Sequence, residues 1–265
     1  MKEQILDFLH AECPWRDTLH WFDSVDSTNS RAKIMAQDGA PHGTVLVAGV
    51  QTGGRGRLGR SFDSQSGGVY FSVILRPGCK ATALMHLTCA AGVAACDALQ
   101  AATGMRPGIK WINDLILGDR KLGGILTELS MIPGTDNVDY AIIGIGINCC
   151  RQISDFPPQL QNLVTTLEAH THRKQNPAAV CAALIERFSL LSQQLLSCRD
   201  ALLAQYRRDC ITLQKDIFIH SPAGVFPGYA IDVDMQGGLV VRCQDGSLRT
   251  VSSGEVSIRG NGSYI

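Results

Sequence analysis

Apolar runs of strand length and of helix length follow one another along the first 211 residues. Short apolar runs bounded by glycine, proline or small polar residues predict strands. Longer runs with apolar residues at helical spacing predict helices. The predicted strands cover residues 18–25, 45–50, 68–75 and 140–148, and the predicted helices cover residues 2–11, 30–36, 81–102 and about 176–208.

A β-hairpin is predicted in the middle of this region. The strand Ile109–Leu117 leads to a turn at Gly118–Arg120, and a return strand covers residues 121–128. Strand alternation would put Lys110 and Asp114 on one face, opposite the face that carries Asn113. A charge on a buried face needs a charged partner or a ligand.

The polar groups of this hairpin allow two interpretations. Lys110, Asn113, Asp114 and Lys121 are numerous for a strand pair otherwise made of isoleucine, leucine and tryptophan. Asp114, with the amide of Asn113 beside it, could hold Mg²⁺, a hard cation that prefers oxygen ligands. The alternative is a lysine–aspartate ion pair on an edge strand, and the segment by itself does not separate the two.

The pattern changes after residue 211. Residues 212–265 are short alternating runs punctuated by turn residues at 221–224, 236–238 and 244–246. This pattern predicts a small all-β barrel of about five strands. We therefore expect two domains, 1–211 and 212–265.

The charge balance of the chain argues against one class of function. Its 265 residues include 24 Lys and Arg and 24 Asp and Glu, a formal net charge of zero. A chain-wide attraction to DNA or to an anionic membrane is not expected, so any basic chemistry must be local. The chain start has charged and apolar residues at helical spacing, unlike a signal peptide. The apolar segment 81–102 contains His86 and Asp97, which favours a buried helix over a membrane span.

Ten cysteines are scattered along the chain without the spacing of a metal site. No C-x-x-C pair occurs among them. Without an export signal, reduced thiols in a cytoplasmic protein are expected. His170 and His172 are close but lack further ligands at metal spacing, so structural zinc is not expected.

A loop rich in glycine and arginine follows the strand at 45–50. The segment Gln51–Arg60, here called the arginine loop, contains Arg55, Arg57 and Arg60 with glycines between them. Glycine lets a backbone approach a ligand closely, and the rigid fork of arginine fits carboxylate and phosphate oxygens. The pattern favours a loop that closes over an anionic small molecule. A solvated surface loop or a nucleic-acid patch is the alternative.

Two further motifs indicate a ligand site. The cluster Ser27-Thr28-Asn29 precedes a predicted helix and is typical of an N-cap, although a hydroxyl not used for capping could face a neutral ligand group. The segment Gly144–Asn148 lacks the third glycine of the dinucleotide fingerprint. Its alternate glycines favour a flat ligand that lies against bare backbone.

Together these motifs resemble those of the biotin protein ligases. The resemblance is strong over about residues 20–150 and extends through Gly254–Arg259. It implies an α+β fold, in which a mixed β-sheet with packed helices, like that of class II synthetases, precedes a small SH3-like β-barrel. Five segments occur in the order seen in that family: Asp26–Asn29, Gln51–Arg60, Lys110–Leu115, Lys121–Leu126 and Gly144–Asn148.

The resemblance implies a two-step reaction in a cytoplasmic enzyme. Biotin would attack the α-phosphate of ATP, in the presence of Mg²⁺, and give biotinyl-5′-AMP and pyrophosphate. A lysine of a biotin carboxyl carrier protein domain would then attack the mixed anhydride and release AMP. No covalent enzyme intermediate is required, so the cysteines are expected to be bystanders. The arginine loop would fold over the anhydride and exclude water.

The resemblance also implies roles for individual residues. Ser27, Thr28 and Gln51 would satisfy the donors and acceptors of the biotin ureido ring. Arg57 and Lys121 would be catalytic, because they would neutralise the biotin carboxylate and the α-phosphate. The other residues expected at biotin are Asn29, Gly54, Arg55, Gly124 and Gly144. Those expected at ATP, besides Arg57 and Lys121, are Phe62, Lys110, Asn113, Asp114, Asn148 and Arg259, with Asp114 also binding the metal.

Three positions depart from the usual family pattern. Ile112 replaces the proline of a common Lys-Trp-Pro-Asn-Asp motif and should change strand geometry only slightly. Phe62 stands where a tryptophan often stacks on adenine, so nucleotide affinity could fall without loss of function. Gly123 replaces a frequent alanine and is neutral to the chemistry.

Other functions stay open as alternatives. A lipoate- or octanoyl-protein ligase shares the fold and the two-step logic, but Gln51 and the Lys-Trp-x-Asn-Asp hairpin favour biotin. Arg57 and Lys121 argue against a non-catalytic biotin sensor. Some family members carry an N-terminal DNA-binding domain, whereas about 20 residues precede the first strand here, which predicts a ligase without direct DNA recognition. An edge strand could serve either the carrier or a homodimer.

Overall fold

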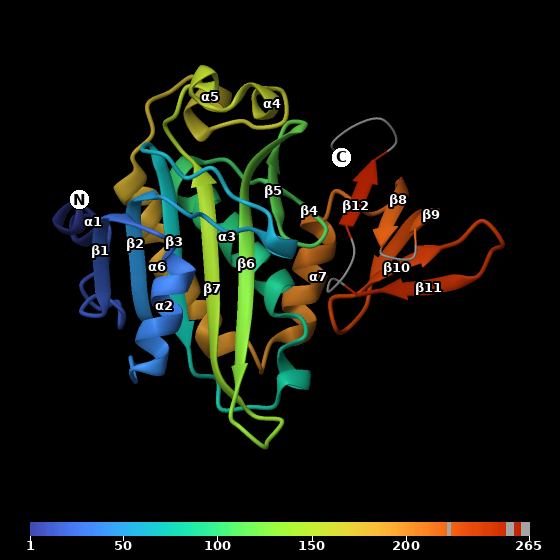
Figure 1. Ribbon diagram of the computed structural model, residues 1–265, viewed down its shortest axis with the longest axis horizontal. Coiled ribbons are helices and arrows are strands. Elements are labelled where there is room, and N and C mark those ends of the chain that lie inside the picture. Colours follow the sequence, from blue (N-terminus) through green and yellow to red (C-terminus); the bar gives the residue numbers. More distant parts are fainter. Residues whose placement is uncertain (222–223, 253–256, 261–265) are drawn as a thin grey trace.

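Two units of secondary structure make up the protein (Figure 1). The structure is a computed structural model that describes residues 1–221, 224–252 and 257–260, the last four by their backbone alone. The first unit is a seven-stranded sheet with packed helices, and the second is a five-stranded sheet. The α+β class expected from the sequence is therefore confirmed.

Most of the predicted strands and helices of the first unit lie close to their expected positions. The strands are β1 (Leu19–Val25), β2 (Thr44–Gln51), β3 (Gly68–Leu75), β4 (Gly108–Lys110), β5 (Asp114–Leu117), β6 (Arg120–Met131) and β7 (Val138–Asn148). The helices are α1 (Lys2–Phe8), α2 (Thr28–Gln37), α3 (Leu87–Thr103), α4 (Pro158–Gln161), α5 (Leu167–Thr171), α6 (Pro177–Gln194) and α7 (Arg199–Asp209). Short 3₁₀ turns occur at Arg57–Gly59, Ala81–Leu84 and Ile153–Asp155.

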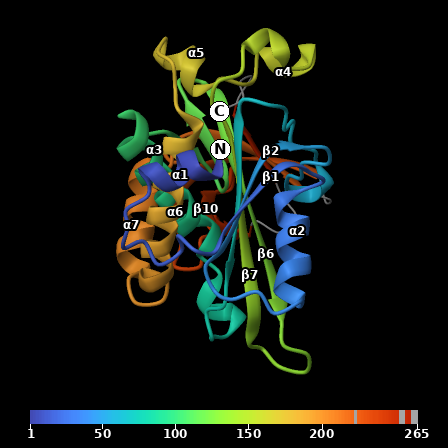
Figure 2. The same cartoon turned by 90° about the vertical axis from the view of Figure 1, so that its left-hand side faces the viewer.

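The large sheet has the strand order β1-β2-β3-β7-β6-β5-β4. Strands β1 and β2 run parallel, and the other neighbouring pairs run antiparallel. Figure 2 shows α2 on one face of the sheet and α1, α3, α6 and α7 on the other. The two faces therefore have separate cores.

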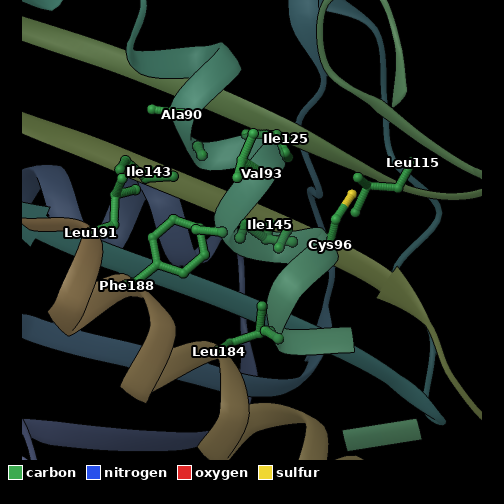
Figure 3. Packing of buried hydrophobic residues seen from close by; sticks show 14 of the residues in the cluster. Ala90, Val93, Cys96, Leu115, Ile125, Ile143, Ile145, Leu184, Phe188 and Leu191 are labelled. Atoms are coloured by element: carbon green, nitrogen blue, oxygen red, sulfur yellow. The ribbon is translucent and has the colours of Figure 1, made fainter. Parts of the chain in front are cut away.

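The larger core lies between the sheet and helices α3 and α6. Ile143 and Ile145 of β7 face Val93 of α3 and Phe188 and Leu191 of α6, all of them buried (Figure 3). Burial of one such side chain stabilises the fold by about 1.5–3 kcal/mol. Tyr140 and Ile142, which alternate with these residues along β7, point to the opposite face and pack toward α2.

The helix α3 contains the most apolar stretch of the chain. By length and composition, Ala81–Thr103 could cross a membrane, but its most apolar window is 72% buried inside the structure. This agrees with the buried helix expected from the sequence.

The strand predicted at Ile109–Leu117 is wrong. The chain instead forms two short antiparallel strands, β4 and β5, joined by a turn at Trp111–Asn113 in which the Trp111–Ile112 peptide is cis. The turn has no glycine or proline, and groups from distant parts of the chain hold it. Thr212 Oγ1 accepts from the Trp111 N–H at 2.8 Å, and the Tyr206 hydroxyl donates to the Ile112 carbonyl at 3.2 Å.

The single helix predicted from Asn176 to about Arg208 is also wrong, because the chain breaks it into α6 and α7. Asn176 caps α6 as expected, since its Oδ1 accepts from the Ala178 N–H at 3.0 Å. At the other end, His86 Nε2 lies 2.9 Å from the Leu195 carbonyl, which satisfies one acceptor left over at the helix terminus. The break allows α7 to pack against α3.

The buried imidazole of His86 is expected to make stability depend on pH. Burial lowers the pKa of His86 below its ordinary 6.5. The unfolded chain then binds a proton that the folded chain does not, so the free energy of unfolding falls as the pH drops below about 6.5, by at most about 1.4 kcal/mol per pH unit from this group. Burial lowers the pKa of His20 and His42 as well, and both act in the same direction.

Urea unfolding of wild type and His86→Gln at about pH 5.5 and about pH 7.5 measures this effect. Glutamine keeps a donor for the Leu195 carbonyl but does not titrate. We expect the variant to lose less stability than wild type on acidification. The same loss in both proteins would contradict the assignment.

The second unit confirms the predicted small β domain of five strands. Its strands are β8 (Asp216–Ser221), β9 (Gly224–Val233), β10 (Leu239–Arg242), β11 (Leu248–Val251) and β12 (Ser257–Gly260), in the order β11-β10-β9-β8-β12. The two units are in close contact. The Ile211 N–H donates to the Ile109 carbonyl at 2.9 Å beside β4, and Trp111 Nε1 donates to the Gly237 carbonyl at 3.0 Å.

Candidate active site

Most of the predicted site residues line one cavity. It has a volume of about 280 Å³ and lies on the α2 face of the large sheet, between the start of α2, the arginine loop and the hairpin β4–β5. The predicted residues that line it are Ser27, Thr28, Asn29, Gln51, Arg55, Arg57, Phe62, Lys110, Asn113, Asp114, Lys121, Gly124 and Gly144.

Glycines of β7 form the floor of the cavity. Ile142 points toward α2, and the same face of the strand continues with Gly144 and Gly146. A Cβ at Gly144 would lie 1.9 Å from Asn29 Oδ1, and one at Gly146 would lie 2.4 Å from the Phe62 ring. The alternate glycines therefore let other groups lie directly against backbone, and in this structure those groups are Asn29 and Phe62.

A buried hydrogen-bond network forms one end of the cavity. Gln51 Oε1 accepts from the Thr28 N–H at 2.8 Å and from its hydroxyl at 3.1 Å. Ser72 Oγ lies 2.8 Å from Thr28 Oγ1 and 2.7 Å from Asn29 Oδ1, and Gln51 Nε2 donates to Ser64 Oγ at 2.9 Å. Neutral donors and acceptors held in this way suit a neutral polar part of a ligand.

The first turn of α2 is both a helix cap and part of the cavity wall. Ser27 Oγ accepts from the Ser30 N–H at 3.4 Å, which is the capping role expected of this cluster, and Ser27 also lines the cavity. Asn29 Nδ2 donates to Glu128 Oε2 at 2.8 Å, and Arg55 donates to both Glu128 oxygens at 3.0 and 3.3 Å. Glu128 of β6 thus connects the arginine loop to the start of the helix.

The other end of the cavity is cationic. Lys121 Nζ donates to Asp114 Oδ1 at 2.7 Å, and Arg57 donates to Asn113 Oδ1 at 3.1 Å. Lys110 lines the same end and is only 5% exposed. Burial lowers the pKa of Arg57, and the negative charge of Asp114 opposes this effect. Three cations face one carboxylate here, an excess of positive charge that suits carboxylate or phosphate groups.

The turn at Trp111–Asn113 is what gathers the polar groups of the hairpin. Lys110 and Asp114 are opposite each other across β4 and β5. Asn113 lies in the turn, donates to the Ile125 carbonyl at 2.9 Å and accepts from Arg57. The predicted separation of Asn113 and Asp114 on opposite faces is therefore wrong, because the chain reverses direction before Asp114.

Two predicted residues do not line the cavity, and the side chain of a third is outside the described part of the structure. Gly54 packs behind it, where a Cβ would lie 2.3 Å from Ser64 Oγ. Asn148 is buried and donates to the Thr165 carbonyl at 3.1 Å, which anchors the loop that follows β7. Arg259 lies in β12, but its side chain, like residues 254–256 of the same motif, is outside the described part of the structure.

The sequence analysis missed two groups of residues at the site. Ser72 and Glu128 belong to the polar network, and a polar residue inside an apolar strand was the signal that could have revealed them. The second group forms an apolar rim of the cavity, in the segment after Pro157 and Pro158. This segment is too short to show a clear periodic pattern. The Lys121 N–H donates to the Leu163 carbonyl at 2.9 Å, which brings this rim to the cavity. The rim residues are Leu160, Leu163 and Val164.

Comparison with known proteins agrees with this geometry. Residues 21–148 match the Biotin/lipoate A/B protein ligase family, and residues 218–259 match the Biotin protein ligase C terminal domain. Over 238 residues the chain is 32% identical to the bifunctional ligase/repressor BirA of Bacillus spizizenii, which covers 89% of this chain and 72% of that protein. It is 29% identical over 242 residues to a biotin–[acetyl-CoA-carboxylase] ligase of Mycobacterium tuberculosis, with 87% and 85% covered. Among solved structures, biotin protein ligase from Aquifex aeolicus in complex with biotin and ATP matches with a TM-score of 0.77 and 29% identity, over 92% of this chain and 99% of that one.

Proposed function

The chain belongs to the biotin protein ligase family, and on that premise we propose that it uses ATP to activate biotin and then transfers biotin to a lysine of a biotin carboxyl carrier domain. One observation carries the proposal. A single cavity joins a neutral hydrogen-bond network to a cationic end. Biotin has the matching chemistry, with a neutral ureido ring at one end and a carboxylate at the other.

The ureido ring binds at the neutral end. It offers two N–H donors and one carbonyl acceptor, and the amides of Asn29 and Gln51 supply both kinds of partner. The hydroxyl of Thr28 and the Ser27 cap complete this end, and Gly144 leaves room for the ring against the backbone. The groups are already ordered by bonds to one another, so little ordering entropy is lost when a ligand replaces those bonds.

The adenylation step takes place at the cationic end. An oxygen of the biotin carboxylate attacks the α-phosphorus of ATP, and the bond from that phosphorus to the bridging oxygen breaks as pyrophosphate leaves. Arg57 and Lys121 offset the repulsion between the two anions and stabilise the charge that builds on the phosphoryl oxygens. A preorganised donor of this kind contributes about 3–4 kcal/mol to the transition state. Lys110 and Asn113 face the remaining phosphates.

The transfer step needs protection from water rather than further chemistry. The carrier lysine amine attacks the acyl carbon, loses its proton, and AMP leaves with the electron pair of the broken bond. The arginine loop lines the cavity and is braced by local bonds, since the Gly56 N–H donates to the Arg60 carbonyl at 2.7 Å and the Phe62 N–H donates to the Gly54 carbonyl at 2.9 Å. Exclusion of water by this loop favours transfer over hydrolysis.

Mg²⁺ fits this site only if the phosphates of the bound nucleotide supply most of its ligands. Among the described residues, no cluster of three or more side chains suits a metal ion. Asp114 supplies one carboxylate, and Mg²⁺ in nucleotide sites commonly takes one or two carboxylates together with substrate phosphates. When bound there it would neutralise charge on the pyrophosphate leaving group.

Several parts of the proposal remain predictions. These are the domain limits 1–211 and 212–265, the carrier domain as the partner and the cytoplasmic location. The absence of direct DNA binding also remains a prediction, which a gel-shift assay tests. Light scattering tests whether an edge strand serves a homodimer, the alternative to carrier docking.

The proposal is tested by exchange of labelled pyrophosphate into ATP. We expect exchange that depends on biotin and not on lipoate or octanoate, because the neutral end has hydrogen-bonding groups that an alkyl chain would leave unsatisfied. Exchange with lipoate or octanoate alone would move the protein to the related ligases. No exchange with any of the three would favour a non-catalytic biotin sensor.

A further inference from the structure

A buried arginine outside the cavity holds the segment that carries Phe62. The side chain of Arg151 is 3% exposed and lies 2.9 Å from Asp63 Oδ2. Its second terminal nitrogen donates to the Asp155 carbonyl at 2.8 Å, and its guanidinium lies 3.8 Å from the centre of the Phe156 ring. An arginine buried this deeply is strongly committed to its partners, because removal of one partner leaves an uncompensated charge.

The segment it holds is the arm, residues 62–67, which connects the arginine loop to β3. Three consecutive residues of the arm are fastened by side chains from elsewhere. Arg151 holds Asp63, Gln51 Nε2 holds Ser64 Oγ at 2.9 Å, and the hydroxyl of buried Tyr70 donates to the carbonyl of residue 65.

Phe62 is the first residue of the arm. It is the one arm residue that the family resemblance assigns to the nucleotide. Its ring contacts Tyr70 edge-on, with centroids 6.5 Å apart, and covers Gly146 on the cavity floor. The ring therefore has one set position as long as the arm stays fastened.

We propose that Arg151 is a positioning residue for the nucleotide. Through Asp63 it fixes the arm so that the Phe62 ring offers a preset face to the purine of ATP. This inference rests on the proposed function. A ring that is already in place need not be ordered when ATP binds, so loss of the ion pair weakens nucleotide binding without removing any contact to biotin.

Kinetics of pyrophosphate exchange test the proposal with Arg151→Met, which keeps the length of the side chain and removes its charge. We expect KM for ATP to rise about tenfold or more while KM for biotin changes less than about twofold. Asp63→Asn, which breaks the pair from the other side, should behave alike, and Arg151→Lys should recover part of the loss. Equal rises in both KM values, or no rise for ATP, would overturn the proposal.

Arg76 offers a matched control within the chain. It also lies 2.9 Å from a carboxylate, that of Asp139, donates to the backbone carbonyl of Ala40 and lies 5.8 Å from the centre of the Tyr140 ring. Arg76→Met should also lower the thermal midpoint, although by less than Arg151→Met, because the Arg76 side chain is 28% exposed. If it also raises KM for ATP selectively, the effect of Arg151 is one of general stability and the proposal fails.

Limited trypsin digestion separates this inference from the proposed function. The arginine loop contains three trypsin sites, and we expect Arg151→Met to raise their cleavage rate about tenfold over wild type because the arm opens locally more often. Unchanged cleavage would overturn the positioning role even in an active ligase. Faster cleavage and weaker ATP binding by calorimetry would support it even if wild type shows no exchange with biotin.

Discussion

Replacement of Lys121 by methionine is expected to slow biotin-dependent pyrophosphate exchange by about 10²–10³-fold, the usual cost of removing a preorganised donor at a developing charge. The reason is twofold. The transition state loses a cation, and Asp114 loses the ammonium that lies 2.7 Å from its carboxylate, so the site offers less positive charge to the incoming phosphates. Methionine keeps the apolar stem of the side chain, so the fold should persist.

Two measurements separate this chemical role from a role in binding. Calorimetry with biotin alone should still show binding, weakened by the loss of one cation at the biotin carboxylate, because the neutral end of the cavity is unchanged. Arg120→Met is the matched control, since Arg120 is the adjacent, exposed cation. An equal loss of exchange in both variants, or full turnover in Lys121→Met, would contradict the role assigned to Lys121.

Replacement of Gly144 by alanine is expected to abolish measurable biotin binding. The new Cβ would lie 1.9 Å from Asn29 Oδ1. Asn29 cannot move away cheaply, because it is buried and bonded to Ser72 at 2.7 Å and to Glu128 at 2.8 Å. Overpacking of this kind costs about 1–3 kcal/mol of folding stability, and the displaced amide adds unsatisfied polar groups. Urea unfolding and biotin calorimetry measure the two effects.

A double substitution gives the control. In Gly144→Ala with Asn29→Ala, the clash is gone, so the stability loss should be smaller than the sum of the two single losses. Biotin binding should stay weak, because the ureido ring still lacks the amide. Additive losses of stability would show that the clash with Asn29 is not the cause. Restored biotin binding would show that Asn29 does not contact the ligand.

Sequence patterns predicted the central sheet because each central strand carries its own signal. Strands β3 and β7 are apolar on both faces over most of their length, as in a buried sheet, and glycine or small polar residues bound them. The strand pair β4–β5 could not be predicted in the same way. Its turn contains Trp111 and Ile112, which are not turn formers, and contacts with residues distant in sequence, such as Thr212 and Tyr206, hold the chain there.

The candidate site was predictable where chemistry sits in a contiguous motif and not where it depends on packing. Arg57 stands in a loop whose composition already indicates an anion site, and Lys121 stands in a segment that the family resemblance assigns to the same site. Ser72 gives only the weak signal of one polar residue in an apolar strand, and its role appears when β3 lies beside the start of α2. Arg151 is a similar case, since its partner Asp63 is distant in sequence.

The contacts of the turn at Trp111–Asn113 bear on how this protein could be divided or recombined. Trp111 bonds to Thr212, in the connection between the units, and to Gly237 in the small sheet. Ile211, which precedes Thr212, donates its N–H to the Ile109 carbonyl in β4. A chain cut after residue 211 would lose both bonds that Trp111 makes, next to Asn113 and Asp114. The small sheet is thus a structural component of the catalytic machinery and not a detachable module, and a chimera must inherit both sides of this junction from the same parent.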